Sequence, residues 1–268
     1  MQNKIIRFRV VLINLIKKIP FNFKGKWSLT LLLCPKNEVK TKLFGYKINL
    51  NPLDLTQKKM LLFDISPKCR DFIKKTVNKG DTFFDIGANV GFYSLLASTL
   101  VGTGKVFAFE PNPNTCSKLQ ESIKLNKIKN INVLNEGLGD YNGQIELHLP
   151  TSIGNETGTM VKTEWGKSII VPVNTLDCIC NKFSIDKIDY LKIDVDGFEP
   201  NVFKGAKYLF KERKIKVIQS EFSDYWLKQN GSSPSLLYNY IINQGFEDLD
   251  GDVVFYKDCV LDRIFVRK

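Results

Sequence analysis

FFDIGANVGFYS at residues 83–94, together with FAFEPNPN at 107–114, decides the fold of this chain. Each stretch begins as an apolar strand and then reaches an acid, Asp85 in the first and Glu110 in the second. An acid that ends the second strand about 20 residues after a glycine turn is typical of a ribose-binding site, because a carboxylate can accept hydrogen bonds from two hydroxyls. The two stretches therefore predict an adenosine-bearing cofactor.

The turn after Asp85 indicates which cofactor this is. It carries Gly87, Asn89 and Gly91 at alternate positions, where glycine permits positive φ and a close approach of the backbone. The third glycine of a dinucleotide motif would fall at Ser94, and there is no Gly-Lys-Ser/Thr run for a triphosphate. Asp85 would repel phosphates and suit a cation. S-adenosylmethionine, with an ammonium, a sulfonium and no phosphate, fits best; a strand-to-helix turn without a ligand is the weaker alternative.

Three segments in this order resemble the FkbM family of S-adenosylmethionine-dependent methyltransferases: FFDIGANVGFYSLLAS, VFAFEPNPNTCSKLQESIKLN, and YLKIDVDGFEPNVFKGA at 190–206. The resemblance runs from about residue 80 to about residue 222. It implies a class I methyltransferase fold and O-methylation of a hydroxyl on a sugar or natural product. The family usually has Glu where Asp196 stands, so the resemblance carries no catalytic role to Asp196.

The resemblance also implies the cofactor-binding residues. The methionine end would be held by the glycine turn and its preceding acid, the ribose by Glu110, and the adenine by residues that follow two later strands. In full, the set is Asp85, Gly87, Asn89 and Gly91 for methionine, Glu110 for ribose, and Pro111, Asn112, Gly139 and Asp140 around adenine.

From residue 80 onward, strand and helix patterns alternate. Strands are predicted at 82–86, 105–109, 131–135, 188–193, 215–220, 245–249 and 262–267, and helices at 91–101, 113–127, 199–212 and 234–243. This alternation predicts an α/β fold, Rossmann-like and doubly wound, around a mostly parallel seven-stranded sheet. Strand patterns at 144–150 and 168–176 predict an inserted β-hairpin, whose long loop at 150–167 is a candidate substrate lid.

Charge divides the chain into two parts. Residues 1–42 hold ten Lys/Arg and one acid, a net charge of +9, and the remaining 29 basic and 27 acidic residues leave +2. We therefore predict a basic N-terminal arm with a lead-in hairpin at 43–55 and helices over 56–79, interrupted near Pro67. This arm and lead-in region fills 1–79, and the methyltransferase domain fills 80–268.

The arm itself has a helical apolar pattern. Within 4–19, apolar residues recur at near-helical spacing among five Lys/Arg, which is typical of a helix that lies on anionic lipid. A helix that caps the domain and a contact in a homo-oligomer are the alternatives. Six cysteines without a metal-binding spacing favour reduced thiols, and the apolar run at 10–16 is far shorter than the ~20 residues of a membrane-spanning helix. We expect a cytoplasmic protein, peripheral on the inner face of the membrane if the helix binds lipid.

Two further acids end predicted strands, Asp194 in YLKIDVDG and Glu221 in KVIQSEF. In a doubly wound sheet the ligand lies beyond the carboxyl ends of the strands, so both should lie beside the methyl donor. Asp194 could take the acceptor proton, or the pair could bind Mg²⁺ and lower the pKa of a chelated hydroxyl. Lys192 is expected to be a buried partner for an acid. The alternatives are that Asp194 caps the following helix or anchors the donor's ammonium, and that Glu221 is a solvated loop acid.

The predicted function is O-methylation of a saccharide or glycoconjugate, with another small natural product or a nucleic acid as alternative acceptors. No nucleic acid partner is expected, because Asp-Val-Asp-Gly replaces the Asn/Asp-Pro-Pro-aromatic run of base methylases and the positive charge sits on the arm. A non-catalytic scaffold is a third class, which would not need the glycine and acid positions that this sequence keeps.

Overall fold

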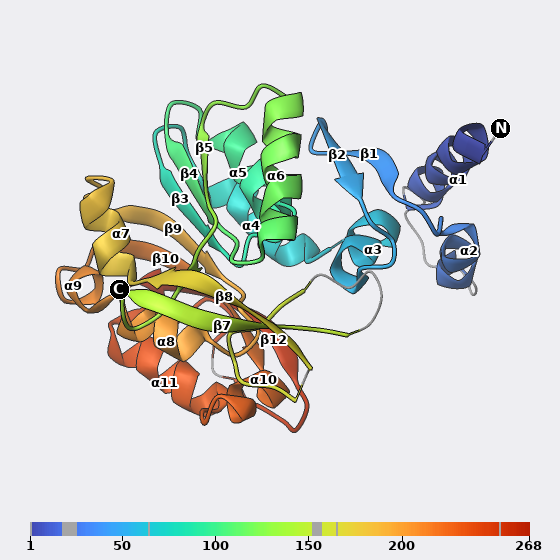
Figure 1. Ribbon diagram of the computed structural model, residues 1–268. Coiled ribbons are helices and arrows are strands. Elements are labelled where there is room, and N and C mark those ends of the chain that lie inside the picture. The colour runs from blue at the N-terminus through green and yellow to red at the C-terminus, as the bar shows by residue number, and fades with distance from the viewer. Residues whose placement is uncertain (1, 18–25, 64, 152–156, 165, 252) are drawn as a thin grey trace.

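A seven-stranded sheet forms the centre of the protein in the computed structural model, which describes residues 2–17, 26–63, 65–151, 157–164, 166–251 and 253–268 (Figure 1). The strand order is β11-β12-β10-β9-β3-β4-β5, and β12 alone runs antiparallel to its neighbours. The strands are β3 (Thr82–Ile86), β4 (Lys105–Phe109), β5 (Ile131–Leu134), β9 (Ile188–Ile193), β10 (Ile215–Ser223), β11 (Phe246–Asp248) and β12 (Val260–Arg267). The predicted doubly wound, mostly parallel sheet is confirmed.

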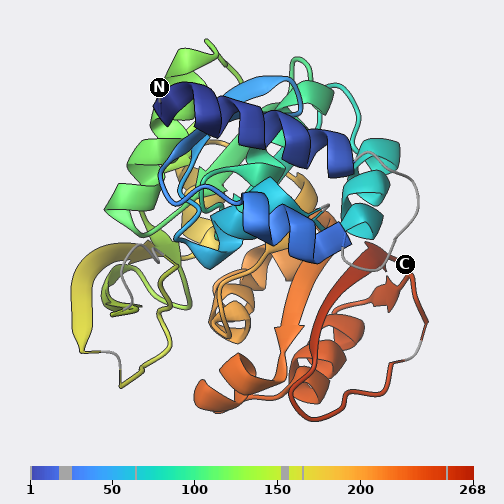
Figure 2. The ribbon, with the colours of Figure 1, turned by 90° about the vertical axis from the view of Figure 1, so that its right-hand side faces the viewer.

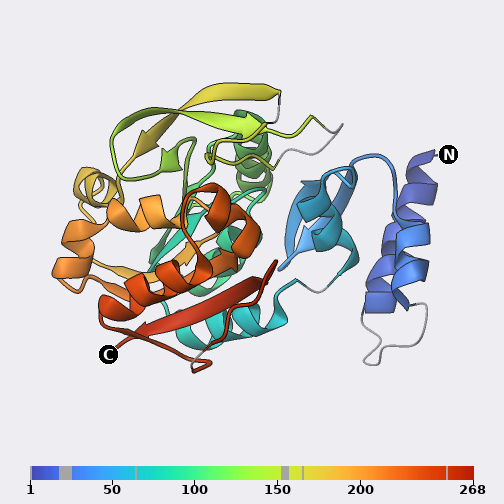
Figure 3. The same cartoon turned by 90° about the horizontal axis from the view of Figure 1, so that it is seen from below.

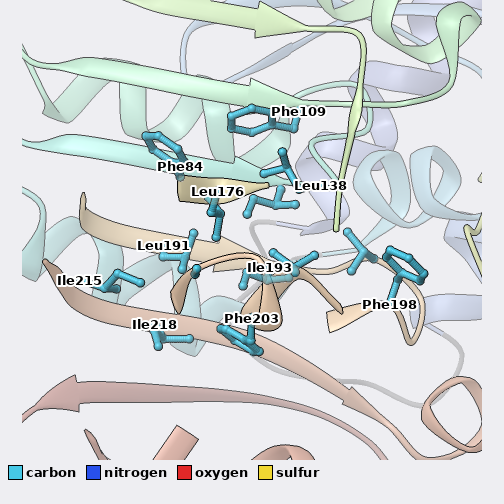
Figure 4. Packing of buried hydrophobic residues seen from close by; sticks show 14 of the residues in the cluster. Phe84, Phe109, Leu138, Leu176, Leu191, Ile193, Phe198, Phe203, Ile215 and Ile218 are labelled. Atoms are coloured by element: carbon cyan, nitrogen blue, oxygen red, sulfur yellow. The ribbon is translucent and has the colours of Figure 1, made fainter. Parts of the chain in front are cut away.

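Helices cover both faces of this sheet because its strands are apolar on both sides. Phe84 and Ile86 of β3 pack with one set of helices, whereas Phe83 packs with the other. The first set is α7 (Leu176–Lys182), α8 (Glu199–Lys204), α9 (Lys207–Lys211), α10 (Asp224–Gln229) and α11 (Pro234–Asn243); the second includes α4 (Pro67–Thr76), α5 (Phe92–Leu100) and α6 (Pro113–Leu125). Figure 4 shows the first interface, where Phe203 of α8 lies near Ile218 and Ile193 of the strands.

The helix predicted over 199–212 is two helices, α8 and α9, separated at Gly205. A Cβ at Gly205 would lie 2.0 Å from the carbonyl oxygen of Gly139, so the break follows a close approach of two backbones. Two short helices, α7 and α10, were not predicted. Thr175 caps α7 by accepting the N–H of Cys178, a capping signal inside the apolar segment that was interpreted as strand.

The inserted hairpin is present as a separate three-stranded sheet of β6 (Gly137–Leu138), β8 (Lys167–Asn174) and β7 (Gly143–Leu149), in the order β6-β8-β7. β7 and β8 pair antiparallel across the predicted lid. Within that lid, Thr159 exchanges both backbone hydrogen bonds with His148, while 152–156 and 165 lie outside the described residues. The described part of the lid after residue 156 is therefore hydrogen-bonded to β7.

The N-terminal region packs against the sheet through a hairpin of β1 (Val39–Leu43) and β2 (Tyr46–Leu50). The hairpin begins four residues earlier than predicted, because Phe44 and Gly45 both have positive φ and form the two-residue turn. α3 (Leu55–Leu62) and α4 confirm the helices predicted on either side of Pro67. α1 (Gln2–Lys17) and α2 (Lys26–Leu33) lie outermost, beyond the hairpin and α3 (Figures 1 and 3).

Candidate active site

A cavity of about 530 Å³ lies at the carboxyl ends of the central strands. Its floor is the predicted edge of the sheet: the turn after β3, the residues after β4 and β9, and the end of β10. Its opposite wall comes from α3 and the segment that follows, with the described end of the inserted loop beside it. Residues that the cavity exposes include Gly87, Asn89, Glu110, Pro111, Asp194, Asp196, Glu221 and Asp262 on the sheet side, and Thr56, Lys59, Met60, Phe63, Ser66 and Thr157 on the other.

The glycine turn is shaped by contacts within the protein. Gly87 has φ +76°, and a Cβ there would lie 1.8 Å from the carbonyl oxygen of Asp194. Gly91 has φ +93°, and its Cβ would meet Leu119 of α6 at 2.4 Å. The prediction placed a ligand where the missing side chains would be, but neighbouring strand and helix fill those directions. The turn faces the cavity at Gly87, Ala88 and Asn89, whereas Gly91 is not part of the lining.

Glu110 occupies the predicted place beside this turn. Its Oε2 accepts the N–H of Asn89 at 2.8 Å and its Oε1 accepts the N–H of Asn112 at 2.9 Å. Burial raises the pKa of Glu110 to about 7, and the two backbone hydrogen bonds oppose that rise. Each carboxylate oxygen keeps further lone pairs, so the group can still accept hydroxyl hydrogen bonds from the cavity. Asn112 is buried outside the lining and caps α6 through Asn114 N–H, so it supports Glu110 from behind.

Asp85 is fully buried and pairs inside the protein. Ser94 Oγ donates to it at 2.6 Å, and Lys192 Nζ lies 3.3 Å from its Oδ1. Lys192 also donates to the carbonyl of Gly87 at 3.0 Å and pairs with Asp194 at 3.6 Å. Burial disfavours the ammonium, but attraction from Asp85 and Asp194 outweighs it and raises the pKa of Lys192. Lys192 is thus the predicted buried partner of an acid, and the trio presents its net negative charge to the cavity at Asp194.

Besides Glu110, four carboxyl groups line the cavity, two of which are the predicted Asp194 and Glu221. The third, Asp262, lies directly across the antiparallel ladder from Glu221, and Ser66 Oγ donates to it at 3.0 Å. The fourth is Asp196, whose pKa is raised to about 8 by burial and by the charges of Asp194 and its neighbours. Burial and the same repulsion raise the pKa of Glu221 well above its usual value. Crowded carboxyls of this kind hold protons near neutral pH.

The turn after β9 is held in an unusual conformation. Asp196 has φ +47°, in the left-handed region, which non-glycine residues enter at a cost. Gly197 follows with φ +90°, and Asn230 Nδ2 donates to its carbonyl at 2.9 Å. Thr159 Oγ1 donates to the carbonyl of Asp196 at 3.1 Å, which links the inserted loop to this turn. Glu199 Oε1 accepts the N–H of Val195 at 3.0 Å, so Glu199 serves the turn and the start of α8.

The residues predicted around adenine are only partly brought together. Pro111 lines the cavity, but Gly139 and Asp140 do not. A Cβ at Gly139 would meet Phe198 and Val173 at 3.2 Å, and Asp140 is exposed. Both residues follow β6 and precede β7, so they lie where the chain has left the seven-stranded sheet for the separate three-stranded one.

Sequence reasoning missed Asp262 and the whole α3 wall. Asp262 lies inside a strand, and only the pairing of β12 with β10 brings it to the cavity. Thr56, Lys59, Met60 and Phe63 carry no motif, and their helix reaches the site by tertiary packing. Thr56 Oγ1 lies 3.5 Å from Thr157 Oγ1, so α3 and the inserted loop meet beside the cavity.

Asp194 and Glu221, the pair predicted to bind Mg²⁺, both line the cavity. In the part of the chain that the structure describes, no group of three Asp, Glu, His or Cys side chains is arranged to hold a metal ion. A Mg²⁺ held by these two carboxylates would take its remaining oxygen ligands from water or a bound ligand.

The strand order, the glycine turn after β3 and the acid after β4 define a class I α/β methyltransferase domain. The model of the methyltransferase FkbM domain matches residues 85–247, more than half of the chain. The chain belongs to the FkbM methyltransferase family, as its three segments indicated.

Two relatives are sugar-modifying or O-methylating enzymes by name. The hexuronic acid methyltransferase AglP of Haloferax volcanii is 31% identical over 139 residues, which are 52% of this chain and 55% of that protein. The 2-O-methyltransferase NoeI of Sinorhizobium fredii is 26% identical over 155 residues, 52% of this chain and 62% of that protein. The chain thus spans somewhat more than half the length of these relatives.

Among solved structures, TYW2 of M. jannaschii in complex with AdoMet is similar at 17% identity. The TM-score is 0.43, and the match covers 88% of this chain and 89% of that one.

Proposed function

We propose that this protein transfers a methyl group from S-adenosylmethionine to a hydroxyl of a saccharide or glycoconjugate. The observation that supports this most is the continuity of the cavity. It contains Glu110, suited to a ribose, and Asp194, suited to an acceptor hydroxyl, at the ends of strands that flank β3 on either side. Family membership and the names of the two relatives support the same reaction.

The donor half of the proposed site is the turn after β3 together with Glu110 and Pro111. Glu110 would accept the ribose hydroxyls, and the backbone of Gly87 and Asn89 would lie along the donor. Asp194 would face the ammonium or sulfonium, because its side chain is partly open to the cavity, whereas Asp85 is fully buried behind it. When bound, S-adenosylmethionine supplies an activated methyl group on a positively charged sulfur.

The acceptor half uses the carboxyl groups around Asp194 and Glu221. The acceptor oxygen would bond to the methyl carbon in line with the breaking carbon–sulfur bond, and its proton would pass to Asp194. Glu221, whose pKa is raised well above its usual value, would hold a proton and donate a hydrogen bond to the acceptor. Positioning can contribute about 7–11 kcal/mol to lowering the barrier, and a base about 10²–10⁴ in rate.

The chemistry of the α3 wall supports an acceptor that carries a negative group. Lys59 is exposed at the rim of the cavity, and its ammonium makes no ion pair with any described residue. A carboxylate on the acceptor would give it a partner away from the acidic edge of the sheet. The name of the archaeal relative, a hexuronic acid methyltransferase, supports a uronic acid as that acceptor.

The proposal is tested by separating donor binding from transfer. Calorimetry with S-adenosylhomocysteine measures the first, and mass spectrometry of uronic-acid and neutral oligosaccharides after incubation with S-adenosylmethionine measures the second. We expect that the protein binds S-adenosylhomocysteine. We also expect that a methyl ether forms on the uronic-acid oligosaccharide. No binding of S-adenosylhomocysteine would overturn the proposed donor site. Binding with methylation of non-sugar hydroxyls alone would overturn the saccharide assignment.

A further inference from the structure

Helix α1 is apolar on two opposite sides. Val10 and Ile13 are buried in the hydrophobic cluster that reaches the central sheet, so this side attaches the helix to the protein. The other side carries Ile5, Phe8, Val11 and Leu15, all exposed and spaced three or four residues apart, which places them along one stripe. A surface helix needs only the first apolar side to pack on its domain, and the second has no partner among the described residues.

Helix α2 extends this exposed surface. α1 and α2 contact each other and lie side by side outside the hairpin, as Figures 2 and 3 show. Leu29, Leu31 and Leu32 of α2 are exposed, and Leu32 keeps 78% of its surface in solvent. We call the seven exposed apolar residues of α1 and α2 the arm face. Single exposed apolar residues are ordinary, but a grouped set on two adjoining helices indicates an interaction surface.

The charge around the arm face favours one kind of partner. Residues 1–42 contain ten Lys/Arg and only one acid, Glu38. That acid pairs with Lys118 of α6 at 3.4 Å, so it is turned to the body of the protein. Arg9, Lys36 and Lys40 are exposed in the same region. Apolar side chains in a region where cations outnumber acids ten to one suit a surface that is negatively charged outside and apolar beneath.

We propose that the arm face docks on an anionic lipid bilayer, with the apolar residues of α1 and α2 in the headgroup region and the surrounding cations against lipid phosphates. A second copy of the chain is a poorer occupant, because it would bring two sets of positive charge together. Among the described residues, no helix is long and apolar enough to cross a membrane.

The test is sedimentation of the full chain with two kinds of vesicle, phosphatidylcholine alone and phosphatidylcholine mixed with phosphatidylglycerol. We expect the protein to pellet with the mixed vesicles, and to do so less as salt rises and screening shortens the reach of the charges. The double variant Phe8→Ser, Leu32→Ser should bind the mixed vesicles at least about tenfold more weakly. A tenfold loss of affinity corresponds to about 1.4 kcal/mol, which the lost burial of two large apolar side chains would exceed.

The matched control is Val254→Ser together with Tyr256→Ser. These two side chains are 89% and 63% exposed, as open as Leu32 and Phe8 at 78% and 63%, but they precede β12 and are remote from the arm. The control should bind mixed vesicles like the unaltered chain. Equal binding by the unaltered chain to both vesicle types, or equal loss in both double variants, would overturn the proposal. Self-association in sedimentation velocity that Phe8→Ser removes would also overturn it, in favour of a second copy.

Discussion

The two sides of the cavity are built in different ways. The sheet side consists of residues that follow β3, β4, β9 and β10, where chain topology alone brings strand ends together. The opposite side consists of α3 residues that approach only because the hairpin and α1 pack them against the sheet. The sheet side is acidic, buried and tightly hydrogen-bonded, whereas Lys59 on the α3 side forms no ion pair with any described residue. The difference teaches that two walls of one cavity can arise by separate rules, one from chain topology and the other from tertiary packing.

The sharpest test of the sheet side is Asp194→Asn. It removes the proposed base and leaves Lys192 with one carboxylate partner. Turnover should fall by about 10²–10⁴, the usual contribution of a general base. Asp258→Asn, at an exposed position outside the cavity, is the matched control and should keep turnover. If Asp194→Asn retains full methyl transfer in an initial-rate assay, the base lies elsewhere.

The next largest effect should be on donor affinity. Glu110 has its pKa raised to about 7 by burial, so it gains its negative charge as pH rises from 6 to 8. Because the charged form accepts ribose hydroxyls better, the Kd for S-adenosylhomocysteine should fall across that range. Glu110→Gln should weaken binding by about 10- to 100-fold, the loss of a hydrogen bond to a charged group, and remove the pH dependence. Calorimetry at several pH values measures both, and a slope that survives in the variant would contradict the assignment.

A smaller effect is expected on the free energy of unfolding, which can be measured without any substrate. Burial raises the pKa of Glu199 to about 7, above its unfolded value, so the folded state binds its proton more tightly. Its stabilising contribution is complete below about pH 4.5 and is lost as pH rises through 7. Glu199→Gln keeps the acceptor for Val195 N–H and should raise the free energy of unfolding at pH 8 by about 1–3 kcal/mol. Urea melts at pH 5 and pH 8 measure this; an equal change at both would show that charge is not the cause.

The smallest effect should come from the α3 side. Lys59→Gln removes an exposed cation, so KM for an acidic saccharide should rise about three- to tenfold, consistent with one partly exposed ion pair. Affinity for S-adenosylhomocysteine and activity on neutral saccharides should stay unchanged. Lys58→Gln on the same helix is the control, since Lys58 is not part of the cavity lining. Equal KM values for acidic and neutral acceptors in the unaltered chain would remove the proposed role of Lys59.

The contrast also explains what the sequence could predict. β3, β4, β9 and the acids at or just after their ends were predicted because an apolar strand and its acid are adjacent in the chain. Asp262 was missed because its role depends on a cross-strand pairing with Glu221 in β10. The sequence predicted a tight turn at Gly87 but not the contact that requires glycine there. That contact is with the backbone of Asp194, over a hundred positions away in the chain. Local signals fixed the elements, while long-range packing assigned the partners.

Helix α3 contributes both to the cavity lining and to the hydrophobic cluster beneath α1. Met60 lines the cavity and also lies in the hydrophobic cluster that contains Val10 and Ile13 of α1. Trimming the chain before the hairpin to obtain a shorter fragment would therefore uncover the back of the α3 wall, even though α1 is not part of the cavity lining. Kinetic work on such a fragment would measure a loosened pocket, and its substrate preference would not represent that of the intact protein.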